Sequence, residues 1–551
     1  MSTLQEQESS TPNESTSLLL PYHHKQTNYQ GSTTHPTGQI YHYMKNSTLF
    51  QLLPTLAIGC SIWFGMTASD ELTLTSIRLL AVFISCIFAL LTTSLNISVL
   101  VLTSLTFLSL TQSFQCQDHI TGQSTECRLC GEINPETGSL YDCRGGPDAF
   151  QSALIGFSSP VVWLIFAAFH LGKAVEVTGL GKRMSLWMIQ SFGKHITGLA
   201  YSIVFSELIL APFVPSNTAR GGGIVLPVVR SIATSLGSTP TSHPQIGGYL
   251  MLVGAHANLL SASMYLTGMA SNPIVLQKAS TLFPDLHFSF VTWITGSIVP
   301  TLICALLLPF ILSRACGLHK QDEKKNTQGD EVIEHAREQL NEMGTMSLKE
   351  SQLCLVLFLC LILWATSAYT SIDSTLVALL GIVTLLYMET IQWKDVAQNT
   401  NAWETFFWLA GFITIASQLS QAGASAYLGN QISLMIQHLH LPATPALSIA
   451  YFLTTFLFSS LSAHTVAFVG TFLDAGHALG VSPMILTCLL AYFSSLGGCM
   501  TNFSTGSSAM YFSPGYVSRS QWFLIGAQLA LFYILVYFTI GLGWWHFLGW
   551  Q

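Results

Sequence analysis

Long apolar stretches, separated by short polar segments, run through most of the chain. Eleven of them contain roughly 20 residues, the length that a helix needs to cross the hydrocarbon core of a bilayer. These stretches lie at about 48–67, 76–93, 96–113, 149–170, 246–272, 286–312, 351–369, 373–391, 404–422, 482–511 and 520–545. The pattern predicts an all-α polytopic membrane protein with about eleven transmembrane helices.

Two further apolar regions have a polar centre. Residues 196–235 contain the sequence Pro-Ser-Asn-Thr-Ala-Arg-Gly-Gly-Gly, and residues 445–480 contain Ser-Ala-His-Thr. The apolar segment on each side of the break is too short to cross a bilayer, so we expect two re-entrant hairpins. Irregular backbone of this kind is tolerated at membrane depth only where protein or a water-filled cavity shields it.

Composition and charge agree with the membrane class and orient the chain. Only 9% of the residues are charged, against roughly 25% in soluble proteins. With residues 1–45 inside, fourteen Lys and Arg fall in inner segments and three in outer ones, which follows the preference of basic residues for the cytoplasm. We therefore expect a cytoplasmic N-terminus, a charged cytoplasmic loop at 313–350 and an extracytoplasmic loop at 114–147.

Residues 1–45 are rich in Ser, Thr, Gln and His, which predicts a disordered cytoplasmic tail. Glu14, followed by Leu18 and Leu19, resembles the acidic dileucine sorting signal of eukaryotic endolysosomal proteins. If the source is eukaryotic, we expect the protein in the plasma membrane or in an endolysosomal or vacuolar membrane.

Four cysteines gather in the predicted outer loop. They are Cys116, Cys127, Cys130 and Cys143. In an oxidising compartment such a cluster predicts two disulfides, and three pairings are open. A zinc site and free thiols remain alternatives, the zinc site being supported by the single Cys-x-x-Cys sequence.

The two halves of the chain resemble each other. The segment around Trp163 is similar to that around Trp408; Trp163 precedes Ser216 by 53 residues, and Trp408 precedes Ser462 by 54. A second polar interruption follows each hairpin, in the sequences NLLSASMYLTGMASNP and GGCMTNFSTGSSAMYFSPG. An odd number of predicted crossings separates the matched segments, so we expect inverted repeats, as in many secondary transporters. The alternative is that these Ser- and Gly-rich stretches only permit close helix packing.

The four polar interruptions suit an anionic ligand. A broken helix exposes unpaired N–H groups, which favour anions, and hydroxyl and amide side chains add further donors. Two such clusters facing each other suit a ligand with an anionic group at each end. The predicted substrate-binding residues are Ser216, Asn217, Thr218, Ser462, Thr465, Asn502, Ser504, Thr505 and Gly506.

Two basic residues accompany these clusters. Arg220 presents a planar donor fork that suits a carboxylate, and His464 lies at the second break. As alternatives, Arg220 pairs only with a carbonyl or with Glu207, and His464 is a packed core histidine. Glu207 and Asp474 are either functional intramembrane acids or internal ion-pair partners.

An enzyme and a channel are alternative classes. Ser462 and His464 are only two residues apart and would point apart on a helix, which argues against an intramembrane hydrolase. We therefore expect no enzymatic activity. Saturable flux that depends on a counter-substrate would exclude an ion channel.

Several stretches resemble a known family. SNTARGGGIVLPVVRSI, SAHTVAF and GFSSPVVWLIFAAFHLGKAVEVTGLGKR are similar to the divalent anion:sodium symporter family, and most of all to its 2-oxoglutarate/malate translocators and citrate/succinate antiporters. The resemblance covers about 48–551 apart from the cysteine loop. It implies a homodimer with a scaffold domain and a transport domain that moves as an elevator, and di- or tricarboxylates of four to six carbons as substrates.

The resemblance also bears on sodium. Ser216, Asn217 and Thr218 match the first carboxylate-binding motif of the family, but the second Ser-Asn-Thr of sodium-coupled members is replaced here by Ser-Ala-His-Thr. In the exchangers a basic residue in each repeat resembles a built-in replacement for sodium, a role that falls to Arg220 and His464. We therefore expect sodium-independent exchange of anions such as 2-oxoglutarate, malate, succinate or citrate, with a sodium-coupled symporter as the alternative.

The resemblance and the pattern together predict the organisation of the chain. We expect lipid and small anions as partners, no nucleic acid, no metal site and no cofactor, with sodium only in the symporter alternative. The expected segments are a tail at 1–45, scaffold helices at 46–113 and 351–403, loops at 114–147 and 313–350, a first repeat at 148–312 and a second at 404–545.

Overall fold

The computed structural model describes residues 48–69, 71–93, 95–134, 138–286, 288–318 and 328–550. The predicted tail, with its dileucine sequence, lies outside these ranges. Residues 52–551 form one compact unit, and the account below concerns that unit.

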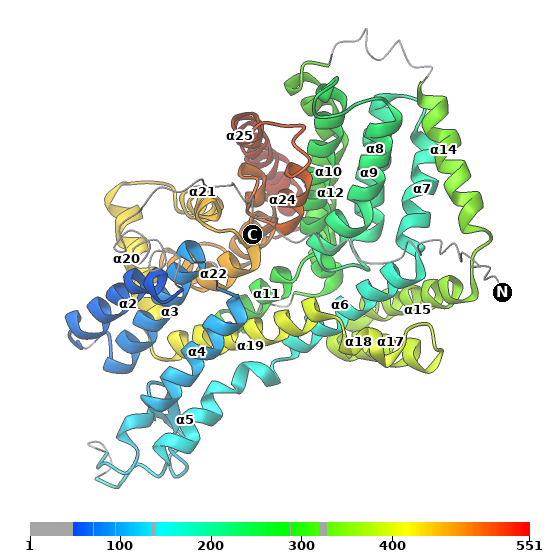
Figure 1. Ribbon diagram of the computed structural model, residues 1–551. Coiled ribbons are helices and arrows are strands. Elements are labelled where there is room, and N and C mark those ends of the chain that lie inside the picture. The colour runs from blue at the N-terminus through cyan, green and yellow to red at the C-terminus, as the bar shows by residue number, and fades with distance from the viewer. Residues whose placement is uncertain are drawn as a thin grey trace, which may run out of the picture. The chain divides into compact units, whose positions relative to one another are not determined.

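Helices dominate the described residues (Figure 1). The α-helices of the first half are α2 (Thr48–Gly65), α3 (Leu74–Thr92), α4 (Ile97–Leu110), α5 (Gly145–Ala153), α6 (Pro160–Thr178), α7 (Leu180–Phe192), α8 (Ile196–Leu210), α9 (Leu226–Ser235), α10 (Pro244–Met264), α11 (Ser271–Leu282) and α12 (Phe290–Ala315). Those of the second half are α14 (Gln328–Met343), α15 (Leu348–Ala365), α16 (Ser367–Thr370), α17 (Ser374–Tyr387), α18 (Trp393–Ala397), α19 (Thr400–Gln421), α20 (Ala424–His438), α21 (Ala443–Thr454), α22 (Leu461–Ala478), α23 (Pro483–Leu496), α24 (Gly506–Phe512), α25 (Arg519–Val536) and α26 (Leu542–Phe547).

Short 3-10 and π-helical pieces join several of these helices. They are η1 (Cys127–Leu129), η2 (Ile155–Ser158), η3 (Thr218–Val225), η4 (Leu266–Gly268), η5 (Thr455–Leu457), η6 (Gly497–Met500) and η7 (Tyr537–Gly541). Three of them, η3, η4 and η6, lie where the sequence predicts polar interruptions. Two strands, β1 (Gln115–Gln117) and β2 (Ser124–Glu126), pair antiparallel in the cysteine loop.

Five helical stretches of the described residues are long and apolar enough to cross a membrane. They are Pro160–Thr178, Phe290–Ala315, Leu348–Ala365, Pro483–Met500 and Arg519–Phe547. Six shorter apolar helices accompany them, α3, α4 and α8 among them. The predicted span at 246–272 is divided, because α10 ends at Met264 and α11 begins only at Ser271. The number of crossings stays a prediction.

Helix α10 forms the centre of the larger hydrophobic core. All of its residues from Gly247 to Met264 are buried, including the polar side chains of His256, Asn258 and Ser261. Helices α8, α9, α12 and α23 surround it, and Figure 1 shows α8, α9, α10 and α12 standing side by side. The polar interruptions after α8 and α10 are therefore held next to each other by packing.

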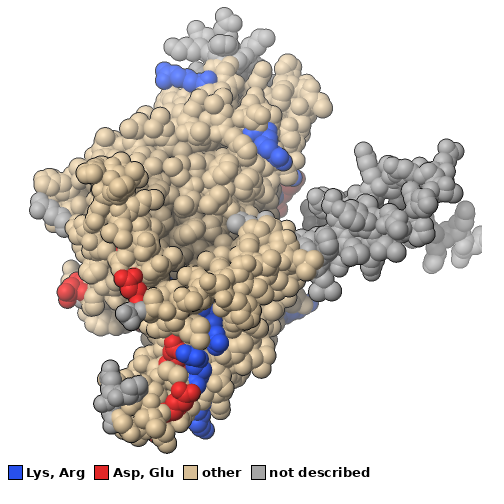
Figure 2. Space-filling view, turned by 90° about the vertical axis from the view of Figure 1, so that its left-hand side faces the viewer, with Lys and Arg blue, Asp and Glu red and all other residues tan. Residues whose placement is uncertain are grey.

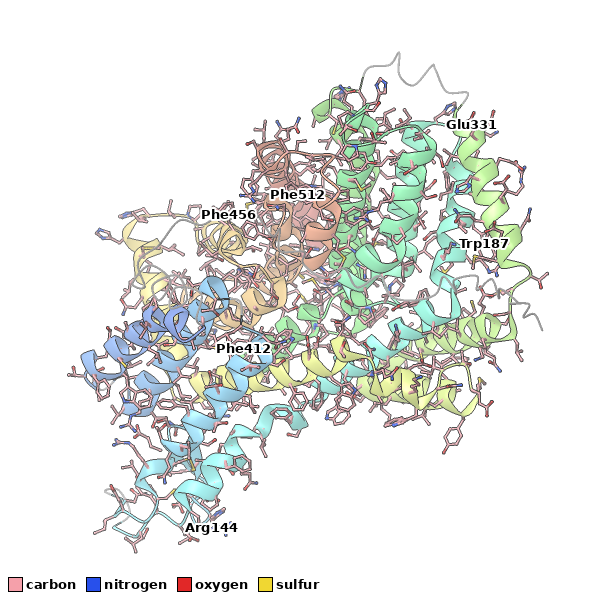
Figure 3. All side chains as sticks on the ribbon, in the orientation of Figure 1. Arg144, Trp187, Glu331, Phe412, Phe456 and Phe512 are labelled. Carbon is pink, nitrogen blue, oxygen red and sulfur yellow. A yellow bond between two sulfur atoms is a disulfide. The ribbon has the colours of Figure 1, made fainter. Side chains whose placement is uncertain are left out.

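A second core lies where α3 and α4 meet α19. Phe412 of α19, labelled in Figure 3, packs edge-on against Phe83 of α3 with ring centroids 6.4 Å apart. Gly156 allows η2 to approach α19 closely, since a Cβ there would lie 1.9 Å from the carbonyl oxygen of Ala410. These contacts fix α19, which leads into the second repeat.

Part of the predicted charged loop at 313–350 is helical. Helix α14 buries Val332 and Ala336 and packs against α7 and α9, because its apolar residues recur on one face. Arg183 of α7 binds Glu350 of α15 through a Nε–Oε1 distance of 2.6 Å, and its Nη1 donates to the carbonyl of Gly344. This segment is therefore more than a solvated connector.

The cysteine loop is closed by two disulfides, as the sequence predicts. Cys116 is bonded to Cys127, and Cys130 to Cys143, which settles the pairing that spacing left open. No group of three or more potential metal ligands occurs among the described residues. On the face shown in Figure 2, most of the charged side chains gather towards the lower end, where Figure 3 labels Arg144.

Candidate functional site

The first break follows α8. The chain leaves the helix after Leu210 and resumes as the π-helical η3 at Thr218. The hydroxyl of Ser216 accepts the N–H of Ala219 at 3.2 Å, and the carbonyl of Ser216 accepts the N–H of Arg220 at 2.9 Å. Ser216 thus caps the start of the second helical segment, in the way that serine satisfies the free N–H groups of a helix end.

The second break repeats this geometry. The hydroxyl of Ser460 accepts the N–H of Ala463 at 3.3 Å, and its carbonyl accepts the N–H of His464 at 3.0 Å. Ser460 lies 244 positions after Ser216, and His464 lies 244 positions after Arg220. The structure therefore makes Ser460, and not Ser462, the counterpart of Ser216.

The same offset relates two glycines. Gly179 joins α6 to α7 with a φ of 79°, and Gly423 joins α19 to α20 with a φ of 83°. They are again 244 positions apart, and only glycine adopts this left-handed conformation routinely. The match of Trp163 to Trp408 is one position out of this register, and the predicted pairing of Ser216 with Ser462 is two positions out. Ser462 instead corresponds to Thr218.

The two breaks meet at a cleft of about 210 Å³. Seven of the nine predicted substrate-binding residues line it, namely Ser216, Asn217, Thr218, Ser462, Ser504, Thr505 and Gly506. The remaining wall is formed by Phe169, Pro215, Met269, Ala270, Thr405, Trp408, Ser459, Ser460 and Leu461. Segments far apart in the sequence thus place hydroxyl and amide groups around one small space.

Gly506 is required for this close approach. A Cβ at Gly506 would lie 2.8 Å from the Cγ2 and Oγ1 of Thr218. Thr505 caps α24 by accepting the N–H of Ser508 at 2.9 Å. The second repeat therefore brings a helix start directly against the first carboxylate-binding motif that the sequence predicts.

Two predicted residues do not line the cleft. Thr465 lies one residue beyond His464 and is fully buried, and its hydroxyl donates to the carbonyl of Leu461 at 2.9 Å. Asn502 is 9% exposed, and its Oδ1 has no hydrogen-bond partner among the described residues. Sequence reasoning overlooked Ser459 and Ser460, which a register based on Gly179 and Gly423 would have found.

Arg220 is fully buried and uses every donor that it has. Its Nε donates to Oε2 of Glu207 at 2.8 Å. Nη1 donates to the carbonyls of Val214 and Gly268, and Nη2 donates to the carbonyl of Asn258 and the hydroxyl of Ser261. The alternative of pairing with Glu207 and with carbonyls is what the structure contains. Arg220 thus has no donor left for a ligand in this conformation.

Asn258 of α10 connects this network to the cleft. Its Nδ2 donates to Glu207 and to the carbonyl of Asn217, both at 3.0 Å. Its Oδ1 accepts the hydroxyl of Ser507 at 2.8 Å. Asn258 therefore ties the first motif to the second repeat without lining the cleft itself.

His464 has different surroundings. It is fully buried, its Nε2 lies 2.9 Å from the hydroxyl of Thr454, and its ring packs against Tyr451, Phe458 and Phe468. Among the described residues no carboxylate lies within 4.0 Å of it. Its contacts are those of a packed core histidine. No hydrogen bond between Ser462 and His464 occurs in the described part of the chain.

Comparison with known proteins relates the chain to membrane transporters. Residues 46–551 match the family described as the sodium:sulfate symporter transmembrane region. A putative malate transporter of Bacillus subtilis, YflS, is 30% identical over 504 residues, covering 91% of this chain and 97% of the relative.

Other relatives carry related names. Dicarboxylate transporter 1 of Arabidopsis thaliana, a chloroplastic protein, is 30% identical over 90% of this chain and 83% of the relative. The L-tartrate/succinate antiporter of Shigella boydii is 32% identical over 71% of this chain and 80% of the relative. Among solved structures, the YdaH transporter of Alcanivorax borkumensis has a TM-score of 0.50 at 12% identity, covering 85% of this chain and 99% of that one, a likeness of fold alone.

Proposed function

This chain belongs to the sodium:sulfate symporter family, and we propose that it exchanges small dicarboxylates across a membrane without sodium. The family and the apolar helices make it an integral membrane protein. The relatives above are named as malate and dicarboxylate transporters and as a tartrate/succinate antiporter, not as enzymes. These names support a dicarboxylate as the substrate.

The cleft between the two breaks supports the same substrate class. Its hydroxyl groups come from both repeats, with Ser216 and Thr218 on one side and Ser460 and Ser462 on the other. A helical segment begins within each pair, at Thr218 and at Leu461, and helix starts favour anions. A ligand with a carboxylate at each end would meet one such cluster per end.

The position of Arg220 carries the proposal of sodium-independent exchange. In many secondary transporters, carbonyl oxygens of unwound helices hold the coupling cation. Here the Arg220 guanidinium binds the carbonyl of Val214 in the first break, that of Gly268 in the α10–α11 interruption and that of Asn258 within α10. A fixed cation thus bridges segments that a sodium ion would otherwise bridge.

Glu207 compensates the charge of Arg220. The pair therefore adds no net charge to the repeat that carries it, and exchange of anions of equal charge is electroneutral. His464, the counterpart of Arg220, would fill the equivalent position of the second repeat. Movement of the repeats as an elevator, assembly as a homodimer and a cytoplasmic N-terminus complete the proposal.

Transport into vesicles of defined content tests this function. Purified protein is reconstituted into liposomes that are empty or preloaded with malate, succinate, 2-oxoglutarate or citrate, with sodium replaced by choline. We expect uptake of radiolabelled succinate only into loaded vesicles, and saturation with concentration. Uptake that requires sodium in place of choline, and that is equal in empty and loaded vesicles, would favour the symporter alternative. Non-saturable flux would favour a channel.

A further inference from the structure

A second and larger cavity lies outside the cleft. This groove has a volume of about 850 Å³ and shares no lining residue with the cleft. Its lining residues come mainly from α3, α11, α19, α20 and α22. Its size lies in the upper part of the range of roughly 300–1,000 Å³ that is typical of ligand pockets.

Most of the groove is apolar. Phe83, Ile84, Ile87 and Phe88 of α3 form an apolar stretch of its wall, and Leu428 of α20 and Phe468 of α22 also line it. Helix α3 is one of the apolar helices of the membrane region. A ligand with a hydrocarbon chain would find apolar contacts along this wall, and the surrounding bilayer is a source of such ligands.

The polar end of the groove holds a cation without a close partner. Lys278 of α11 lines the groove, and within the described part of the chain it has neither a hydrogen bond nor an ion pair within 4.0 Å. Asp474 also lines the groove and acts electrostatically on Lys278 from beyond 4.0 Å, and its carboxylate accepts the hydroxyl of Ser425. A charged group among apolar surfaces is stable only when it is paired, so Lys278 requires an anion.

Gln277, the residue before Lys278, has a side-chain oxygen that lacks a hydrogen-bond donor among the described residues. Its Nε2 donates to the hydroxyl of Ser159 at 3.1 Å, whereas its Oε1 is buried and has no partner among the described residues. The groove is therefore lined, at successive positions of α11, by an ammonium group without a close partner and by an amide whose oxygen has no partner among the described residues. A phosphodiester with a hydroxyl-bearing headgroup offers an anionic oxygen and a donor in the same molecule.

We propose that this groove binds a membrane lipid with an anionic headgroup. Its phosphate pairs with Lys278, a hydroxyl of its headgroup donates to Gln277, and an acyl chain lies along Phe83 and Ile87. Charge complementarity at Lys278 selects the anionic class, because a zwitterionic headgroup would bring its own cation next to the ammonium group. The dicarboxylate cleft has no part in this site.

Lipid binding to the full-length protein tests the proposal. The protein is purified in detergent, stripped of lipid and titrated with phosphatidylglycerol or phosphatidylcholine, and bound lipid is measured by native mass spectrometry. We expect phosphatidylglycerol to bind at least about tenfold more tightly, the difference that one charge-assisted hydrogen bond makes. Equal affinity for the two lipids would overturn the proposal.

Variants of Lys278 locate the effect. Lys278→Gln should remove the preference for phosphatidylglycerol, and Lys278→Arg should keep it. Lys173→Gln is the matched control, since Lys173 lies outside the groove and pairs with Glu176. A preference that survives in Lys278→Gln as it does in Lys173→Gln would place the lipid elsewhere.

Asp474→Asn distinguishes the headgroup class. Asparagine can still accept the hydroxyl of Ser425, but it no longer competes for Lys278, so phosphatidylglycerol should bind as tightly as to the wild type or more tightly. A loss equal to that of Lys278→Gln, with phosphatidylcholine affected alike, would mean that both charges recognise a zwitterionic headgroup, and the anionic assignment would be wrong.

Discussion

The two helix breaks share one backbone design and differ in chemistry. Ser216 and Ser460 cap them with matching hydrogen bonds, four residues before Arg220 and His464. Arg220 then enters a fully bonded ionic network around Glu207, whereas His464 packs among aromatic rings. The two repeats thus share the serine cap that begins the helical segment after each break. The residue four positions later differs, since Arg220 is ion-paired and His464 is packed among aromatic rings.

Removal of Arg220 should have the largest effect. Arg220→Ala leaves Glu207 buried without its cation, and breaking one side of a buried pair costs about 3–5 kcal/mol. The matched change His464→Phe keeps the aromatic packing and loses one hydrogen bond to Thr454, worth at most about 1.5 kcal/mol. Thermal unfolding of the purified proteins measures both, and equal losses at the two breaks would contradict the comparison.

A double variant separates stability from transport. Replacing Arg220 and Glu207 together by Met and Leu removes both charges, a change that is often neutral for stability. We expect the melting temperature to recover relative to Arg220→Ala while exchange in choline buffer stays absent, since no cation bridges the carbonyls of Val214 and Gly268. Recovery of exchange would show that Arg220 serves folding alone.

The two repeats should contribute more equally to substrate binding in the cleft than Arg220 and His464 contribute to stability. Thr218 and Ser462 are counterparts and both line the cleft. If each donates to one carboxylate, Thr218→Ala and Ser462→Ala should each weaken succinate binding about ten- to a hundredfold, from the roughly 1.5–3 kcal/mol of a hydrogen bond to a charged group. Isothermal titration in detergent measures this, with Thr465→Ala, buried outside the cleft, as the control that should bind normally.

The sequence predicts the breaks well because their signals are local. Prolines, glycines and polar residues inside apolar stretches mark where a helix cannot continue, and the cysteine cluster marks the disulfides. It does not predict the partner of Arg220, because Glu207 reaches it only after α8 and η3 fold against each other, and Asn258 arrives from α10. It also misplaces the second serine by two residues, because Ser460 and Ser462 both lie at the second break and only the hydrogen bonds of Ser460 match those of Ser216.

Replacing Gly179 or Gly423, the glycines that join two helices in each repeat, should lower stability by similar amounts. Gly179→Ala and Gly423→Ala each force an alanine into the left-handed region, at a cost of about 1–2 kcal/mol. An added Cβ meets only the Cε of Met343, at 3.5 Å, near Gly179 and nothing within 4 Å near Gly423, so backbone strain accounts for both losses. Unfolding temperatures that differ widely between the two variants would show that the joints are not equivalent.

The smallest effect is expected in the cysteine loop, where a carboxylate network lies outside the membrane-spanning helices. The hydroxyl of Thr121, together with the N–H groups of Ile120 and Asp142, donates to Asp118 and holds the pKa of this carboxyl below its usual value. Such a carboxyl contributes its full stabilisation at pH values above its pKa in the unfolded chain, which is about 3.9. This contribution is lost as the pH falls through the lower pKa of the folded state. The two disulfides keep the loop closed, so the loss should stay local.

Hydrogen exchange of peptides from 114–147, corrected for the intrinsic effect of pH, should accelerate below about pH 4 in the wild type. In Asp118→Asn it should show no such dependence. An acceleration of the same size in Asp118→Asn would contradict the assignment of the effect to this carboxyl.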